Sequence, residues 1–279
     1  IFLGDNLYWQ GLRENDLDRG KAVLMQQLEA TQAHKLFVPG NHDWSFDAET
    51  GASTLRRQQE FIHAFSGNTA EFLPTMGCPG PVVKVLSKGV AAGKKKIVLV
   101  ALDTHWWLMT DTQWRPDCDA VTTADIVGNL KAALIEYKDD IVIVAAHHPL
   151  KSSGPHGGFK RRWIIDFLSW LFEFQQDIGD PLYEEMKVQL GSAFRANPPA
   201  IYASGHDHSL QVMQGGEFAK YLLLSGAGSK KKVSPVTQIA ETLFAHGHEG
   251  FMVVDFYDGV NAGALLQIVE PGEAAPVAT

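Results

Sequence analysis

The sequence predicts a mixed α/β fold whose C-terminal half is largely β. Strand-like and helix-like hydrophobic patterns alternate along the chain, and the continuous apolar run of residues 141–146 is typical of a strand covered on both faces. Beyond residue 200 the strand-like segments follow one another with no long helix between them. The 279 residues, 45% hydrophobic and 20% charged, have the composition of a globular chain, which excludes disorder, collagen and a coiled coil.

The N-terminal part of the chain begins with three apolar residues that run directly into a turn. Ile1–Leu3 is typical of the end of a buried strand, so we expect the natural N-terminus to lie further upstream. Apolar residues at helical spacing predict a helix over residues 17–33. The next expected elements are a strand at 35–38, which Pro39-Gly40 ends, a helix at 54–65, and strands at 81–86 and 96–102.

The central and C-terminal parts continue this pattern. Thr122 is a good N-cap for a helix that runs to about Lys138, and the apolar strand at 141–146 follows it. After a predicted helix at 181–194 we expect strands at 200–203, 210–213, 221–224, 251–256 and 264–269. The residues from 271 to 279 have the composition of a linker or a frayed end.

Polar residues follow four of these apolar runs at the point where each run ends. The four clusters are Gly4-Asp5-Asn6, Gly40-Asn41-His42-Asp43, His147-His148-Pro149 and Gly205-His206-Asp207-His208. The carboxyl ends of strands in an α/β sheet are where sites are built, so four such ends on one sheet would converge on one place. Imidazole, carboxylate and amide oxygen together suit Zn, Fe, Mn or Ni.

A pair of metal ions is the chemistry that these residue types favour. The two oxygens of a carboxylate such as Asp5 can bridge two ions, and the two histidines of His206-Asp207-His208 can reach one ion each. Lone histidines are more often ordinary hydrogen-bonded residues, which is how we interpret His34, His63, His105 and His156. We interpret His246-Gly247-His248 as a surface pair.

The order of the four clusters resembles that of the calcineurin-like metallophosphoesterases. That family carries Gly-Asp, Gly-Asn-His-(Asp/Glu), a lone histidine and Gly-His-x-His, and these correspond here to residues between 4 and 208. The resemblance implies a four-layer α-β-β-α sandwich with two mixed sheets flanked by helices. The family's first motif, Asp-x-His or Asp-x-Gly, is absent, which implies a single domain at 1–270 that lacks its first strand–helix unit and one metal-binding aspartate.

The resemblance also implies a role for each motif residue. Asp5 would bridge the metals, Tyr8 and His208 would bind the first metal, and Asn41, His147 and His206 would bind the second. His42 would contact the phosphate or protonate the leaving group, Asp43 would orient His42, and His148 would lie in the outer shell. A hydroxide activated by the two cations would attack phosphorus in line.

A finer similarity is to the purple, tartrate-resistant acid phosphatases. Asp5-Asn6-Leu7-Tyr8 is similar to their Gly-Asp-Asn-x-Tyr segment, in which the tyrosine binds ferric iron as a phenolate. Residues 205–211 and 224–228 also resemble that branch. The similarity implies a phosphomonoesterase that uses iron together with iron, zinc or manganese, and a protein exported to the periplasm or the extracellular space.

Two other functions remain open on the sequence. The first is a phosphodiesterase or nucleotide hydrolase of the same superfamily, since the motifs do not determine the leaving group. The second is a non-catalytic binding module of a longer chain. The resemblance implies a small phosphate ester as substrate. We expect no nucleic-acid partner, because the net charge is −8.

Two further features leave alternatives open. The aromatic segment at 155–178, with most of its rings in 159–176, is either a helix packed on the domain or a substrate lid, a dimer contact or a membrane-surface helix. Cys78 and Cys118 are either a single disulfide or two reduced thiols.

Overall fold

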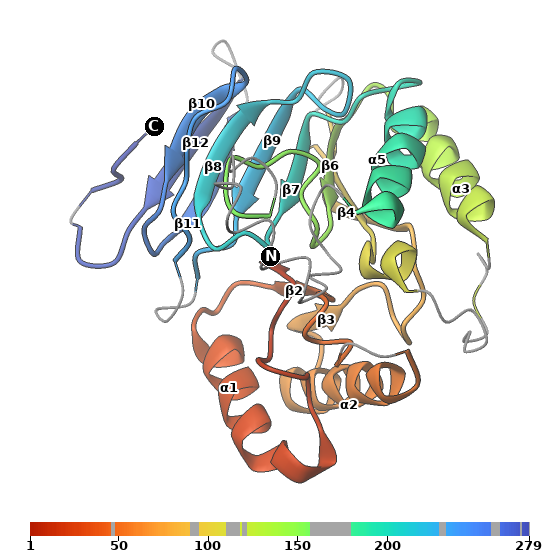
Figure 1. Cartoon of the computed structure of the whole chain (residues 1–279), viewed down its shortest axis with the longest axis vertical. Helices are drawn as coiled ribbons and strands as arrows, with labels where there is room; N and C mark the ends of the chain where they lie inside the picture. Colours follow the sequence, from red (N-terminus) through yellow and green to blue (C-terminus); the bar gives the residue numbers. More distant parts are fainter. Residues whose placement is uncertain are drawn as a thin grey trace, which may run out of the picture.

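A seven-stranded mixed sheet is the largest element of the fold (Figure 1). The computed structural model describes residues 1–45, 48–89, 95–109, 118, 122–156, 180–228, 233–257, 263–273 and 275–278. Within them the sheet has the order β10-β8-β9-β7-β6-β5-β4, and its inner strands β9, β7, β6 and β5 are parallel. The strands are β4 (Val82–Ser87), β5 (Ile97–Ala101), β6 (Ile141–Ala145), β7 (Ile201–Ser204), β8 (Leu210–Gln214), β9 (Tyr221–Ser225) and β10 (Thr242–His246).

A second β layer packs against one face of this sheet. It contains a three-stranded sheet in the order β1-β2-β3 and a separate antiparallel hairpin, β11–β12. The bounds are β1 (Phe2–Leu3), β2 (Lys35–Val38), β3 (Ala70–Phe72), β11 (Phe251–Tyr257) and β12 (Gly263–Val269). The resemblance implied a second mixed sheet, but the three described strands are all parallel because helices make the crossovers between them.

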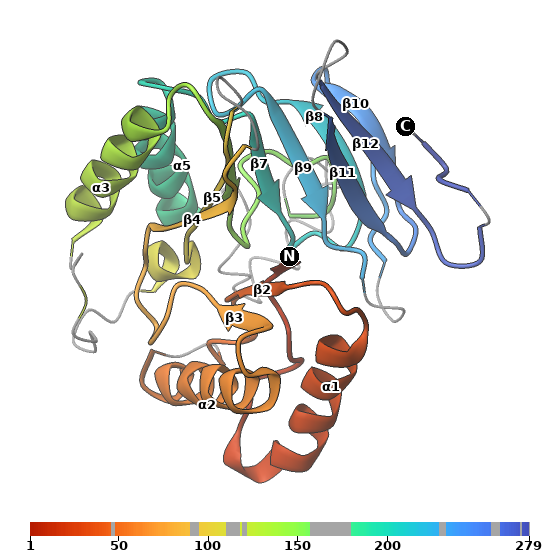
Figure 2. The same cartoon turned by 180° about the vertical axis from the view of Figure 1, so that it is seen from behind.

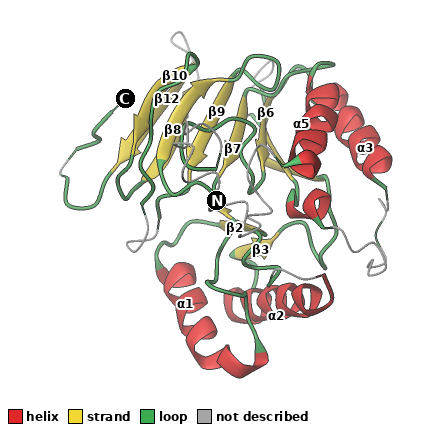
Figure 3. Ribbon diagram, viewed as in Figure 1, coloured by secondary structure: helices red, strands yellow, loops and turns green. Residues whose placement is uncertain are grey.

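Helices cover both outer faces (Figures 2 and 3). On one side lie α1 (Leu17–Glu29) and α2 (Ala48–Ser66), and on the other α3 (Thr123–Glu136) and α5 (Pro181–Phe194). Two short 3₁₀ helices, η1 (Glu14–Asp16) and η2 (His105–Leu108), complete the described helical elements. The expected four-layer α-β-β-α arrangement is confirmed.

Three hydrophobic cores separate the four layers. Alternate residues of β5 show the arrangement: Val100 faces the core under α3 and α5, and Leu99 faces the core between the two β layers. That middle core also contains Ile268 of β12, so the hairpin packs on the large sheet. The third core contains Phe37 of β2 and lies under α1 and α2.

Hydrogen bonds at its N-terminus explain why helix α3 begins where the sequence predicted. The Thr122 side chain accepts a hydrogen bond from the Asp125 amide at 3.1 Å, and the Asp125 carboxylate accepts one from the Thr122 amide at 2.9 Å. This reciprocal capping box satisfies two N–H groups that the first turn leaves without partners, which confirms the predicted N-cap of α3.

The structure differs from the sequence predictions at short elements. We did not predict β3 or β10, which have three and five residues. The segment after Pro271 turns back and hydrogen-bonds to β12, since the Val277 amide donates to the Ile268 carbonyl at 2.9 Å. The aromatic segment at 155–178 lies outside the described residues except for its first two positions.

Two further findings complete the description of the fold. A disulfide joins Cys78 and Cys118, which decides between the two alternatives that the sequence left open. Among the described residues, no helix has the length and apolar character needed to cross a bilayer.

Candidate metal centre

The four polar clusters converge at the facing ends of the two β layers. Asp5 follows β1 and Asn41 follows β2 in the small sheet, whereas His147 follows β6 and His206 follows β7 in the large one. We expected four strand ends of a single sheet to meet. The structure brings them together from two sheets, because both layers point their carboxyl ends at the same place (Figure 1).

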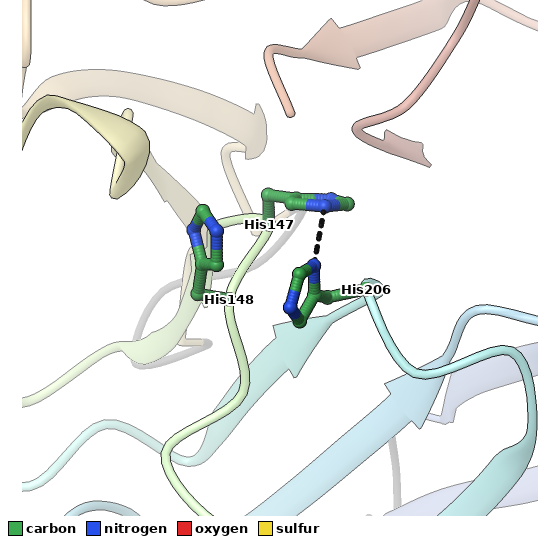
Figure 4. Close-up of side chains that lie close together, drawn as sticks. All are labelled: His147, His148 and His206. Carbon is green, nitrogen blue, oxygen red and sulfur yellow. Dashed lines mark hydrogen bonds between the residues drawn. The ribbon is translucent and has the colours of Figure 1, made fainter. Parts of the chain in front are cut away.

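One group of donors surrounds the Nε2 atom of His147. The Asn41 Oδ1 atom lies 3.0 Å from it, the Asp5 Oδ1 atom 3.3 Å and the His206 Nδ1 atom 3.2 Å. Figure 4 shows a ring nitrogen of His206 directed at the His147 ring, with His148 beside them. All of these side chains are buried or nearly so.

The hydrogen bond on the other side of the His147 ring fixes its tautomer. Its Nδ1 atom lies 2.7 Å from the Leu3 carbonyl, which can only accept, so Nδ1 carries the proton. An imidazole held by a backbone carbonyl in this way is typical of metal ligands. The Nε2 lone pair then points at two oxygen acceptors, an arrangement that needs a cation or a second proton.

The charges at this point are strongly coupled. Burial alone would raise the pKa of Asp5, but His147 foremost, with His42 and His206, holds the pKa well below its usual range. Burial alone would lower the pKa of His147, and the neighbouring Asp5 outweighs that effect and raises it. Without a metal, a proton on His147 therefore balances the carboxylate.

A second group of donors surrounds the other oxygen of Asp5. The Tyr8 hydroxyl donates to Asp5 Oδ2 at 3.1 Å and lies 2.8 Å from the Nε2 atom of His208. Burial, and then the charge of Asp5, raise the pKa of Tyr8. The two oxygens of one carboxylate thus face two separate sets of donors, which is the arrangement expected of a bridging ligand.

Glycines in the two N-terminal loops allow the backbone of these loops to pass close to the ligand side chains. Gly4 has a φ of +90°, and a Cβ there would lie 2.7 Å from the Cγ atom of His147. A Cβ at Gly40 would collide with the backbone nitrogen and Oδ1 of Asp5. Asp5 and His206 are themselves left-handed, with φ of 55° and 66°, a conformation that non-glycine residues rarely adopt.

His42 lies at the edge of the cluster. Its backbone amide donates to Asp5 Oδ1 at 3.0 Å, and its Nδ1 atom donates to the Trp9 carbonyl at 2.8 Å. The Nε2 atom lies 3.9 Å from Asp5 Oδ2, and the side chain is 15% exposed. The ring is thus oriented with Nε2 toward the donors.

Asp43 makes contacts that differ from its expected role. The sequence suggested that Asp43 orients His42, but its buried carboxylate accepts hydrogen bonds from the amides of Gly40, Asn6 and Leu7 at 2.9, 3.2 and 3.2 Å. Burial foremost, and then the charge of Asp5, raise the pKa of Asp43 to about 7. Asp43 therefore ties the two N-terminal loops together.

His148 lies close enough to His147 and His206 to act as a ligand itself, although the resemblance placed it outside the ligand set. One nitrogen from each of His147, His148 and His206 lies within 4.8 Å of the others. The Nδ1 atom of His148 bonds the Thr104 hydroxyl at 2.9 Å, and its buried Nε2 atom has no hydrogen-bond partner among the described residues. Burial keeps the pKa of His148 well below its usual range, so the ring is neutral.

Sequence reasoning missed several neighbours of the cluster. The ring of His156 lies 4.4 Å from that of His206, and the ring of His105 stacks 6.1 Å from that of His148. Burial lowers the pKa of His105 to about 3. Thr104 and the Trp9 carbonyl were also missed. These are lone residues or backbone groups, and no motif marks them.

The donor set fits metal ions. Carboxylate, imidazole, amide and phenol groups converge, the His147 ring is held as ligands usually are, and a buried imidazole nitrogen of His148 lacks a partner among the described residues. The residues predicted as ligands, Asp5, Tyr8, Asn41, His147, His206 and His208, all lie in the two donor groups.

Comparisons with known proteins place this chain. The profile of a family described as calcineurin-like phosphoesterase matches residues 1–210. No curated protein matches the chain.

Similar solved structures include GAP50, the anchor in the inner membrane complex of Plasmodium, at 17% identity and a TM-score of 0.47. They also include a purple acid phosphatase from yellow lupin seeds, at 13% and 0.40, and a putative 5'-nucleotidase from Staphylococcus aureus, at 15% and 0.43. The matches cover 75%, 62% and 93% of this chain, but only 55%, 28% and 40% of those chains.

Proposed function

This chain belongs to the calcineurin-like phosphoesterase family, and we propose that it hydrolyses phosphate monoesters at a centre of two metal ions, as acid phosphatases do. The observation that carries the proposal is the position of Asp5. Its Oδ2 atom lies 3.1 Å from the Tyr8 hydroxyl and its Oδ1 atom 3.3 Å from His147 Nε2, so one carboxylate serves both donor groups.

We assign the ligands from these two groups. Tyr8 and His208 would hold one ion and Asn41, His147 and His206 the other, with Asp5 between them. The bound cations would neutralise the charge of the phosphate and supply a hydroxide nucleophile at neutral pH. This would allow a protein of net charge −8 to act on an anionic ester.

Tyr8 favours iron at one of the two positions. Burial and the charge of Asp5 raise the pKa of its hydroxyl, so only a strong Lewis acid would convert the phenol to a phenolate there. Ferric iron is such an acid. We propose Fe at this position and Fe, Zn or Mn at the other.

His42 is the residue that we propose to contact the substrate. The Trp9 carbonyl accepts a hydrogen bond from Nδ1 at 2.8 Å and so orients Nε2 toward the donors; in the imidazolium form Nε2–H would donate to a phosphate oxygen or protonate the leaving group. The supporting residues keep this geometry: Asp43 joins the loops that carry Asp5 and His42, and Thr104 holds His148 beside the donors.

Nucleotide hydrolysis is a second candidate, and Trp9 favours it. The Trp9 side chain follows Tyr8 directly, is 57% exposed, and its ring lies 5.7 Å from that of His42. An aromatic ring beside the proposed leaving-group position would suit esters that carry a base.

Export to an oxidising compartment is part of the proposal. Disulfides persist in the periplasm and outside the cell, and the Cys78–Cys118 bridge supports such a location. The proposed contact of 159–176 with a membrane surface or a second subunit lies outside the described residues.

The test compares three phosphate esters. Protein loaded with Fe, Zn or Mn is assayed between about pH 4 and 9 with para-nitrophenyl phosphate, with its bis-ester and with a nucleoside monophosphate, and metals are counted on the same sample. We expect two metal ions at this centre and faster turnover of the monoester. Faster turnover of the bis-ester would favour a phosphodiesterase. Faster turnover of nucleoside monophosphates would favour the nucleotide hydrolase. No turnover with metals bound would favour a non-catalytic binding module.

A further inference from the structure

A second cluster of histidines and a carboxylate lies at the ends of β10 and β12. His246 is the last residue of β10, His248 lies two positions further on, and Glu270 follows β12 directly. One nitrogen or oxygen atom from each lies within 4.8 Å of the others. None of these residues belongs to the candidate metal centre, and the sequence alone marked the two histidines only as a surface pair.

The two oxygens of Glu270 are divided between the two imidazoles. The Nδ1 atom of His246 lies 2.6 Å from Oε1, and the Nδ1 atom of His248 lies 3.5 Å from Oε2. The two rings stack 4.3 Å apart at an interplanar angle of 16°, so both present the same ring atom to one carboxylate. A Cβ at Gly247, between them, would lie 2.8 Å from the Ser234 carbonyl oxygen, so a side chain there would crowd this turn.

The carboxylate of this cluster is nearly buried, whereas the two imidazoles are exposed. The Glu270 side chain is 9% exposed, whereas those of His246 and His248 are 42% and 65% exposed. Among the described residues, the ion-pair partners of Glu270 are these two histidines alone. No lysine or arginine in the described part of the chain forms an ion pair with this nearly buried carboxylate, so a bound cation would be a suitable partner for it.

A comparable histidine and glutamate pair elsewhere is built differently. The Nε2 atom of His34 lies 2.7 Å from Glu71, but Lys84 bonds the same carboxylate and the Glu71 side chain is 36% exposed. That pair needs no further cation. The contrast shows that the cluster at Glu270 is more than a common surface ion pair.

We propose that His246, His248 and Glu270 bind a divalent transition-metal ion of the Zn²⁺ type. Two imidazoles and a carboxylate are a ligand set that such ions accept, with solvent in the remaining position. Ligand bonds of about 2.0–2.2 Å place neighbouring ligand atoms roughly 3.3–3.6 Å apart, which the His248–Glu270 distance already matches. His246 would move away from Glu270 by about 1 Å, and its exposed ring has room to do so.

There is space for the solvent ligand. A groove of about 250 Å³ opens beside the cluster, lined by Val233, Gly247, His248, Glu249, Glu270 and Pro271. Glu249 also lines this groove, and its negative charge favours a cation nearby.

The ion would join elements that the backbone leaves separate. The hairpin β11–β12 pairs only with itself in the described part of the chain, apart from a bridge between Ile268 and Ala278. β10 is an edge strand of the large sheet, where His246 pairs with Leu210. A metal bound by His246 and Glu270 would therefore fasten the hairpin to the sheet edge, and we expect it to stabilise the fold.

The test measures Zn²⁺ binding directly and does not depend on hydrolysis. Metal-free protein is titrated with Zn²⁺ by calorimetry, and the bound metal is counted after gel filtration. Wild type should bind one equivalent more than His248→Ala and Glu270→Gln, or bind that equivalent at least about 10–100-fold more tightly. The imidazole nitrogen signals of His246 and His248 should shift in nitrogen-15 NMR spectra as this equivalent binds.

Two controls separate a built site from non-specific binding. His34→Ala removes an exposed histidine that is already paired with Glu71, and it should bind as much Zn²⁺ as wild type. His248 is 65% exposed, so its loss should leave the circular dichroism spectrum unchanged. Equal stoichiometry and affinity in wild type and both cluster variants, or an equal loss in His34→Ala, would overturn the proposal.

Discussion

The buried cluster around Asp5 and the surface cluster around Glu270 combine the same side-chain types in opposite ways. The buried cluster takes its residues from loops of two sheets, and Asp5 and His206 hold left-handed backbone conformations there. The surface cluster is built from two strand ends and a single turn, with both imidazoles open to solvent.

This difference shows what each arrangement demands. Strained backbone and buried charge cost stability, so they persist where a fixed geometry serves a reaction. The surface cluster needs no such strain, and a metal bound there would fasten the hairpin to the sheet edge without altering the buried cluster. We therefore expect the buried cluster to govern activity and the surface cluster to govern only metal content and stability.

The largest expected effect comes from Asp5→Asn, which tests this division directly. Asparagine keeps the size and one acceptor for the His42 amide, but it loses the charge and the second acceptor that faces Tyr8. Loss of a bridging carboxylate removes several kcal/mol of charge stabilisation, so kcat/KM should fall by about 10³-fold or more. Para-nitrophenyl phosphate hydrolysis and metal analysis measure the effect.

Glu270→Gln is the matched change in the surface cluster. It removes one carboxylate charge from two neighbouring imidazoles, as Asp5→Asn does, and it should leave kcat/KM within about twofold of wild type because no proposed reacting group is touched. A loss of activity in Glu270→Gln as large as in Asp5→Asn would break the distinction between the clusters.

The sequence predicted the buried cluster because its residues lie in motifs at strand ends. Strong local patterns also placed β6 and α5 within about one residue, since continuous apolar runs and the Asp180-Pro181 start leave few alternatives. β10 was not predicted, because its five residues are half-exposed and alternate weakly. The position of His246 beside Glu270 depends on that strand, so the surface cluster could not be seen from sequence.

The contacts that orient the buried cluster were equally hidden. The Trp9 carbonyl that holds His42 is a backbone group, which any residue provides, and Thr104 lies 44 positions before its partner His148. Asp43 illustrates the reverse case: its motif position was recognised, but its bonds to Asn6 and Gly40 follow from how two loops pack. Motifs identify side chains, and tertiary packing decides which of them touch.

Tyr8→Phe should have the next largest effect and sharpens the account of the buried cluster. Phenylalanine keeps the ring but removes the hydroxyl that lies 2.8 Å from His208 and 3.1 Å from Asp5. Iron-loaded wild type should absorb in the visible range through a phenolate, and the variant should lose this band together with about 10–100-fold in kcat. Absorption spectra of iron-loaded protein decide the question.

The matched control is Tyr202→Phe. Tyr202 is another buried tyrosine, and its hydroxyl donates to the His148 carbonyl at 2.8 Å, outside the two donor groups. Its loss should lower stability and leave the visible band in place. A colourless iron-loaded wild type, or a band that survives in Tyr8→Phe, would exclude the phenolate.

The last prediction, for Asp103→Asn, concerns stability and not activity, and it tests the protonation of a buried carboxylate behind the buried cluster. The buried Asp103 carboxylate accepts hydrogen bonds from the Trp44 indole at 2.7 Å and the His105 amide at 3.0 Å. Burial raises the pKa of Asp103 from 3.8 to about 7 despite these bonds. The folded protein therefore takes up a proton at this residue across that range.

The sign of the pH dependence follows from this shift. Because the folded pKa exceeds the unfolded one, the stability associated with protonated Asp103 is fully present below pH 3.8 and is lost as pH rises through about 7. The asparagine side chain of the variant does not titrate. The free energy of unfolding of Asp103→Asn minus that of wild type should therefore increase between about pH 4 and 7 by about 2–4 kcal/mol and level off above.

Urea unfolding at four pH values, about 4.5, 6, 7.5 and 8.5, measures this difference across the titration. Asp16→Asn is the control, because its carboxylate is 39% exposed beside Arg19 and should give nearly the same difference at every pH. A flat difference for Asp103→Asn would mean that Asp103 stays ionised in the folded protein and that its hydrogen bonds outweigh burial. A difference that rises with pH would show that the layer behind the buried histidines accommodates a neutral side chain better than a charged one. The imidazoles of the surface cluster are open to solvent, so charged side chains near them do not carry this cost.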